Sequence, residues 1–94
     1  MKSKKTNLSY NGYANYETWT ISVWDYIPGL AEIAFDADEK EVGYSWCADM
    51  VWDLIDGDRY DGIVGDWVSA MWGEVDWREI AEHVNEHLVE LYMS

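Results

Sequence analysis

Apolar residues recur at three- and four-residue steps along most of this chain, which is the spacing of one face of an α-helix. The pattern is most regular after Asp76, where one face carries Trp77, Ile80, Ala81, Val84, Leu88 and Leu91. Asp76 and Glu79 also have the spacing of a capping box, which starts a helix. The periodicity therefore predicts an all-α fold, a compact bundle of four or five short helices.

Two short helices are expected in the first half of the chain. Asn15 can cap a helix whose apolar pattern continues to Ile27. The β-branched run at 18–23 also fits a strand, but the three- and four-residue steps fit a helix better. Pro28 suits the first turn of a second helix, which continues toward Ala37.

The second half predicts a helix over 44–55, a loop over 56–62 and two more helices. Apolar residues cover well over half of the wheel of the 44–55 segment, as expected for a central helix. The next helix is expected to face inward with Ile63, Trp67, Val68 and Met71, although Gly65 weakens that pattern. Four tryptophans lie on predicted apolar faces and are expected in the core: Trp19, Trp52, Trp67 and Trp77.

The length of 94 residues is that of one domain. Residues 1–12 are polar and lack periodicity, so we expect a flexible N-terminal segment followed by a single helical domain over 13–94. An apolar fraction of 49% with seven Trp and seven Tyr is the opposite of a disordered composition.

Negative charge dominates this sequence. Nineteen acidic residues against six Lys and Arg give a net charge of −13, and three of the six cations are Lys2, Lys4 and Lys5. Such a surface repels phosphate, which argues against direct binding to nucleic acid or to an anionic membrane. Positively charged partners are favoured instead.

Cysteine usage and hydropathy bear on the compartment. The single Cys47 cannot form an internal disulfide, so a reducing compartment fits best and the thiol is expected in the core. No apolar run resembles a signal peptide or approaches the ~20 residues of a membrane span. We therefore expect a soluble cytoplasmic protein.

Candidate chemical motifs are weak. His83 to His87 reads H-x-x-E-H, an order found in zinc peptidases, but no third ligand follows downstream. The loop 56–62 lacks the ligand positions of a calcium site, and no serine has the glycines of a nucleophile elbow. The sequence therefore predicts a non-enzymatic protein without metal or cofactor.

Carboxylates form rows at helical spacing. One row would lie along the last helix, a second would begin on the 44–55 helix and continue into the loop, and a third cluster lies within 36–41. Members of a row are about one turn, ~5.4 Å, apart, a scale that suits imitation of a phosphate backbone. The second row consists of Asp49, Asp53 and Asp56. The partner-binding residues expected from the first two rows and the loop that follows are Glu79, Glu82, Glu86, Glu90, Asp49, Asp53, Asp56, Asp58 and Asp61.

Three further tryptophans lie near the edges of the predicted helices: Trp24, Trp46 and Trp72. If they are exposed, they are natural anchors for a protein partner, because Trp and Tyr dominate interface hot spots. An alternative interpretation follows, in which the aromatic surface is the active part and the charge only maintains solubility. The wide apolar faces also make a homodimer credible.

Two stretches resemble a family of short phage and mobile-element proteins. Residues 15–19 read N-Y-E-T-W and are followed by Trp24, which resembles the opening motif of that family. Residues 75–82 are similar to its closing segment. The resemblance implies a mobile-element origin, while Asn15, Glu17 and Trp19 are themselves interpreted as helix start and core.

Together these features predict an inhibitor of a host defence system, acting as an acidic DNA mimic. An anti-CRISPR role is favoured and an anti-restriction role comes next. The expected partner is a nucleic-acid-binding defence protein, either a CRISPR-Cas component or a restriction enzyme, whose groove the carboxylates would occupy.

Overall fold

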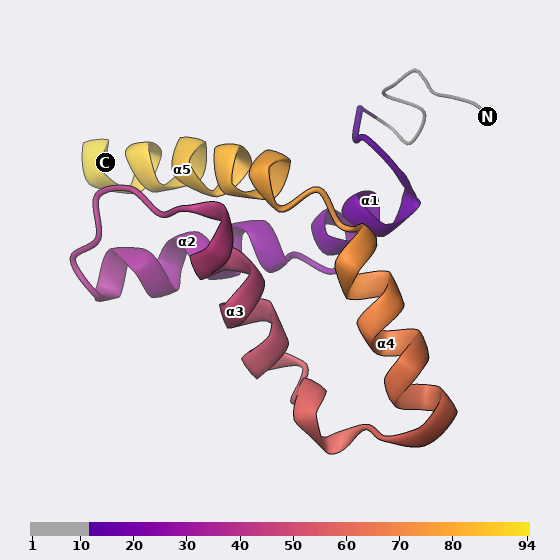
Figure 1. Cartoon of the computed structure of the whole chain (residues 1–94). Coiled ribbons are helices and arrows are strands. Elements are labelled where there is room, and N and C mark those ends of the chain that lie inside the picture. The colour runs from indigo at the N-terminus through magenta and orange to yellow at the C-terminus, as the bar shows by residue number, and fades with distance from the viewer. Residues whose placement is uncertain (1–11) are drawn as a thin grey trace.

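The computed structural model describes residues 12–94, and this part of the chain is all-α, as predicted (Figure 1). The twelve-residue segment expected to be flexible lies outside the described residues except for Gly12. The elements in chain order are α1 (Tyr16–Val23), α2 (Tyr26–Asp36), α3 (Tyr44–Leu54), the short 3-10 helix η2 (Gly57–Arg59), α4 (Gly62–Glu74) and α5 (Trp77–Met93).

The core forms where α2 and α3 pack against α5. Helices α2 and α5 lie side by side, while α3 and α4 extend away from them and are joined at their far end through η2 (Figure 1). The apolar residues with no exposed surface come from all three core helices: Leu30, Ala31, Ala34, Cys47, Ile80, Val84 and Leu88. The apolar face predicted for the last helix is therefore confirmed, with Leu91 partly buried at its end.

The first helix begins where it was predicted, but the boundary between the first two helices lies earlier in the chain than expected. The Asn15 side chain accepts a hydrogen bond from the Thr18 amide, which caps α1. Helix α1 ends at Val23, because Asp25 adopts a left-handed backbone with φ 63°. The first helix therefore does not reach Ile27, and Pro28 lies in the first turn of α2 as expected.

Helix α4 faces solvent, which corrects the prediction of an inward apolar face. Ile63, Trp67 and Met71 keep 63%, 62% and 46% of their surface exposed, and only Val68 is partly covered. No residue of α4 is buried, and the helix packs mainly on α1 and η2. The prediction was wrong because periodicity defines an apolar face but does not reveal what covers that face.

Helix α3 is also less enclosed than its composition suggested. Its buried residues are Cys47, Ala48 and Val51, whereas Tyr44 and Leu54 are about half exposed. Only part of the broad apolar face of α3 therefore packs in the core, and the rest of that face remains exposed to solvent. None of the helices within residues 12–94 combines the length and the apolar character needed to cross a membrane.

A set of polar contacts joins the start of α1 to the start of α5. Asp76 caps α5 by accepting from the Glu79 amide at 3.1 Å, whereas its own amide donates to Thr18 Oγ1 at 2.8 Å. The Glu79 carboxylate accepts from the Ala14 amide at 3.0 Å, so only half of the predicted capping box forms. Asn15 Nδ2 completes the set by donating to the Glu74 carbonyl.

Candidate protein-binding surface

Four exposed apolar residues follow one side of α4, and we call them the α4 stripe: Ile63, Val64, Trp67 and Met71. Ile63, Trp67 and Met71 repeat at four-residue steps, so they form a line about 12 Å long at 1.5 Å per residue. The only charged residues of α4 are Asp66 and Glu74. An uncovered apolar line on an otherwise acidic protein is the kind of surface that binds another protein.

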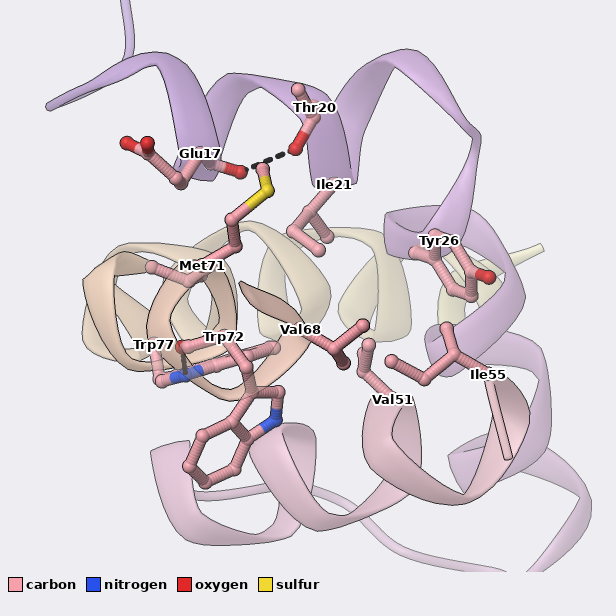
Figure 2. Close-up of a pocket in the computed structure, with 11 residues that line it drawn as sticks. Glu17, Thr20, Ile21, Tyr26, Val51, Ile55, Val68, Met71, Trp72 and Trp77 are labelled. Atoms are coloured by element: carbon pink, nitrogen blue, oxygen red, sulfur yellow. Dashed lines mark hydrogen bonds between the residues drawn. The ribbon is translucent and has the colours of Figure 1, made fainter. Parts of the chain in front are cut away.

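An apolar pocket of about 220 Å³ opens beside the α4 stripe, between α1, α3 and α4 (Figure 2). Ile21, Val51, Ile55 and Val68 are among its walls, and Glu17 is the one charged residue that lines it. Met71 belongs to the α4 stripe and also lines this pocket. The exposed line and the pocket therefore form one continuous apolar surface.

The tryptophans expected at helix edges differ in accessibility. Trp24 is 75% exposed in the turn after α1, as a partner anchor requires. Trp46 is only partly exposed and packs against the core. Trp72 is also partly buried, and its Nε1 donates to the Ala48 carbonyl at 3.1 Å.

Trp67 is 62% exposed, which corrects the prediction that it lies in the core. It was expected in the core with Trp19, Trp52 and Trp77, of which Trp77 is buried and the other two are partly exposed. The near absence of charge along α4 was the available signal. The apolar spacing of this helix predicts burial instead, because such a face is usually covered by its own chain.

A second pocket lies between α3 and α4, with a volume of about 570 Å³. It is lined by Asp49, Trp52, Asp53, Ser69, Trp72 and Gly73. The Trp52 and Trp72 rings meet edge to face with their centroids 5.4 Å apart. Aromatic and acidic side chains therefore share one cavity, which we call the Trp-Asp pocket.

The acidic row on α5 is reduced to three exposed members. Glu82, Glu86 and Glu90 are exposed along the helix, whereas Glu79 is half-buried and bonded to the Ala14 amide. Glu86 Oε1 lies 3.4 Å from His83 Nδ1. Three consecutive carboxylates one turn apart thus remain open to a partner.

The second row bends away after two members. Asp49 and Asp53 are exposed on α3, but Asp56 follows the end of that helix in a left-handed conformation with φ 55°. Asp58 accepts a hydrogen bond from Trp52 Nε1 at 3.0 Å, and Asp61 is exposed just before α4. On α3 the second row is therefore reduced to Asp49 and Asp53, because Asp56 lies beyond the end of the helix.

The cations of the described segment lie against tyrosine rings. Lys40 is 4.0 Å from the centre of the Tyr92 ring. The guanidinium groups of Arg59 and Arg78 are 5.1 Å and 4.9 Å from the rings of Tyr60 and Tyr44. Within residues 12–94, no Lys or Arg lies within ion-pair distance of an Asp or Glu, so none of these three cations forms an ion pair with an acidic row.

The two histidines line a shallow pocket between α5 and the start of α2. Its walls include Tyr13, Asp25, His83 and His87, and the Tyr13 and His83 rings have centroids 5.2 Å apart. In the part of the chain described here, no three His, Cys, Asp or Glu side chains gather as metal ligands.

Cys47 is fully buried on α3, which confirms its expected place in the core. Burial raises the pKa of its thiol to about 11. The neutral thiol therefore behaves as a small apolar side chain at physiological pH.

Comparison with family models, curated proteins and solved structures gives no match to this chain.

Proposed function

We propose that this protein is a non-catalytic inhibitor that binds a basic, nucleic-acid-binding surface of a host defence protein as an acidic mimic of DNA. A CRISPR-Cas component is the favoured target and a restriction enzyme is next. The observation that carries the proposal is the set of uncompensated carboxylates, because all three cations of the described segment lie on tyrosine rings. A soluble domain without such a role normally mixes charges of both signs.

Two surfaces would divide the work of binding. The carboxylates of Glu82, Glu86 and Glu90 would attract and orient Arg and Lys side chains that otherwise hold phosphates. The α4 stripe and Trp24 would supply the apolar contact that holds the complex together. Long-range charge mainly accelerates association, whereas buried aromatic contact mainly slows dissociation.

Isosteric neutralisation of the α5 row tests this proposal. The triple variant Glu82→Gln, Glu86→Gln and Glu90→Gln should slow capture of a nucleic-acid-binding defence protein from bacterial lysate, with the loss greatest at low salt. The control is Glu32→Gln with Asp36→Asn, which removes two charges from exposed residues one turn apart on α2. Capture that is equal for both variants at every salt concentration would refute the mimic.

A second candidate function is a protein-interaction or assembly module that uses apolar contact alone. The specific observation in its favour is that α4 contributes no buried residue and keeps Trp67 62% exposed. This candidate predicts the reverse pattern. The change Trp67→Ala would abolish partner capture in a folded protein, and the triple glutamine variant would bind normally at all salt concentrations.

A further inference from the structure

The Trp-Asp pocket combines the groups that recognise a positively charged side chain. Trp52 and Trp72 line it with indole rings, and Asp49 and Asp53 add two carboxylates one helical turn apart on α3. Ser69 and Gly73 line it from α4, and both residues are small, which leaves room in the pocket. The volume of about 570 Å³ is large enough for a long side chain.

Both indoles are held in place before any ligand arrives. Trp52 Nε1 donates to Asp58, and Trp72 Nε1 donates to the Ala48 carbonyl. The Trp77 ring packs behind Trp72 with a centroid distance of 5.8 Å, and its Nε1 donates to the Trp72 carbonyl. Because binding does not have to order these rings, less conformational entropy is lost on binding.

The carboxylates of Asp49 and Asp53 lack a cationic partner in the described part of the chain. Both are exposed, and none of Lys40, Arg59 and Arg78 forms an ion pair with them. Two like charges at this spacing repel each other, and an incoming cation would relieve that repulsion. The pocket therefore has a charge complementary to Arg or Lys.

We propose that the Trp-Asp pocket is a receptor for an arginine side chain of the partner protein. The aliphatic stem of the arginine packs on the two indoles, and its guanidinium group donates to Asp49 and Asp53. Arginine fits better than lysine, because a planar guanidinium stacks on aromatic rings and can donate to two carboxylates at once. This inference rests on the proposed function in taking the partner to be a basic protein.

A metal ion fits the pocket less well. Calcium takes six to eight oxygen ligands, and this cavity offers two carboxylates and the Ser69 hydroxyl. Indole rings are not metal ligands, so their presence favours an organic cation.

A peptide titration tests the pocket directly. The probe is a blocked peptide with two arginines separated by alanine, and its counterparts carry lysine or the neutral isostere citrulline. The indole N–H signals of Trp52 and Trp72 in isotope-labelled protein report binding. The arginine peptide should shift both signals to saturation, the lysine peptide should bind more weakly, and the citrulline peptide should leave them unchanged.

Two variants remove the pocket in different ways. The pair Asp49→Asn and Asp53→Asn keeps the shape but removes the charge, and should weaken peptide binding about tenfold or more. Gly73→Leu fills the opening and should abolish binding; a Cβ at Gly73 meets no atom within 4 Å, so the helix accepts it. The pair Glu32→Gln and Asp36→Asn is the charge-matched control and should bind as the wild type does.

The outcomes separate this inference from the proposed function. Equal shifts with citrulline, or binding that survives both pocket variants, would overturn the arginine receptor. Capture of a defence protein that is unaffected by the Asp49 and Asp53 changes would also overturn it, while leaving the mimic intact. Peptide binding that follows the predicted pattern, without any captured defence protein, would support the pocket and refute the mimic.

Discussion

Among residues 12–94, Thr18 is the one polar residue whose side chain is fully buried, and it connects two distant parts of the chain. Its hydroxyl donates to Asn15 Oδ1 and accepts from the Asp76 amide, 58 residues away. The helix starts at Asn15 and Asp76 could be predicted from the sequence, because capping is local. The bond between Thr18 and Asp76 could not be predicted, because local patterns carry no information on which chain segments meet.

Replacement of Thr18 by valine should destabilise the fold by about 1–3 kcal/mol. The shape of the side chain is nearly kept, but the Asp76 amide loses its acceptor in a partly buried place. Urea unfolding measures the loss. Thr20→Val is the control, because Thr20 Oγ1 donates only to the Glu17 carbonyl of its own helix. Equal losses for the two variants would contradict this role of Thr18.

Cys47 should respond to pH in a defined window. Its pKa is about 11 in the folded protein and near 9.0 in the unfolded chain, so between these values the unfolded state has already lost the proton. Stability should therefore fall as the pH rises from 9 toward 11, by at most ~3 kcal/mol. The same pH series on Cys47→Ala should lack this part of the decline; an identical decline would refute the assignment.

Gly57 is needed in η2 because the Trp52 indole lies directly against it. A Cβ at Gly57 would overlap Trp52 Cε2, so the ring would have to move and lose its bond to Asp58. The change Gly57→Ala should shift the Trp52 indole signal and cost roughly 1–3 kcal/mol. Gly43→Ala, where a Cβ meets no atom within 4 Å, should leave both unchanged. An unshifted signal in Gly57→Ala would contradict the packing.

For helix α4, the sequence predicts the helix itself but not which of its faces is buried. Its existence and its apolar stripe follow from the spacing of Ile63, Trp67 and Met71, but the stripe faces solvent instead of the core. In contrast, the apolar face of α5 is covered by α2 and α3 as expected. The two helices differ in their tertiary surroundings. Helix α4 is connected through η2 and extends away from the layer formed by α2 and α5, so these helices do not cover its apolar stripe (Figure 1).

Because α4 is exposed, replacement of its tryptophan should affect partner binding but hardly change the stability of the fold. Trp67→Ala should change the free energy of unfolding by less than about 1 kcal/mol, because the ring is largely in water already. Trp77→Ala should cost about 3–5 kcal/mol, because that ring is buried in the core. Urea unfolding of both variants is the measurement. Similar costs would mean that α4 is covered in solution.

The charge of the whole protein should make its stability depend on salt. Nineteen acidic residues and three cations fall within 12–94, and the cations lie on tyrosine rings. Screening of this repulsion by added sodium chloride should raise the melting temperature, by roughly 5 °C. The triple glutamine variant of Glu82, Glu86 and Glu90 should melt higher at low salt and respond less. A melting temperature independent of salt would show that the rows do not repel.

The central proposal concerns the whole surface: carboxylates that have no Lys or Arg partner within residues 12–94, together with the exposed α4 stripe, bind a protein that normally binds nucleic acid. The most direct test is capture of partners from bacterial lysate on the wild-type protein, at low and high salt, with duplex DNA as competitor. We predict capture of a nucleic-acid-binding defence protein that is released both by salt and by DNA. Capture that is indifferent to both would contradict the mimic and assign binding to the α4 stripe alone.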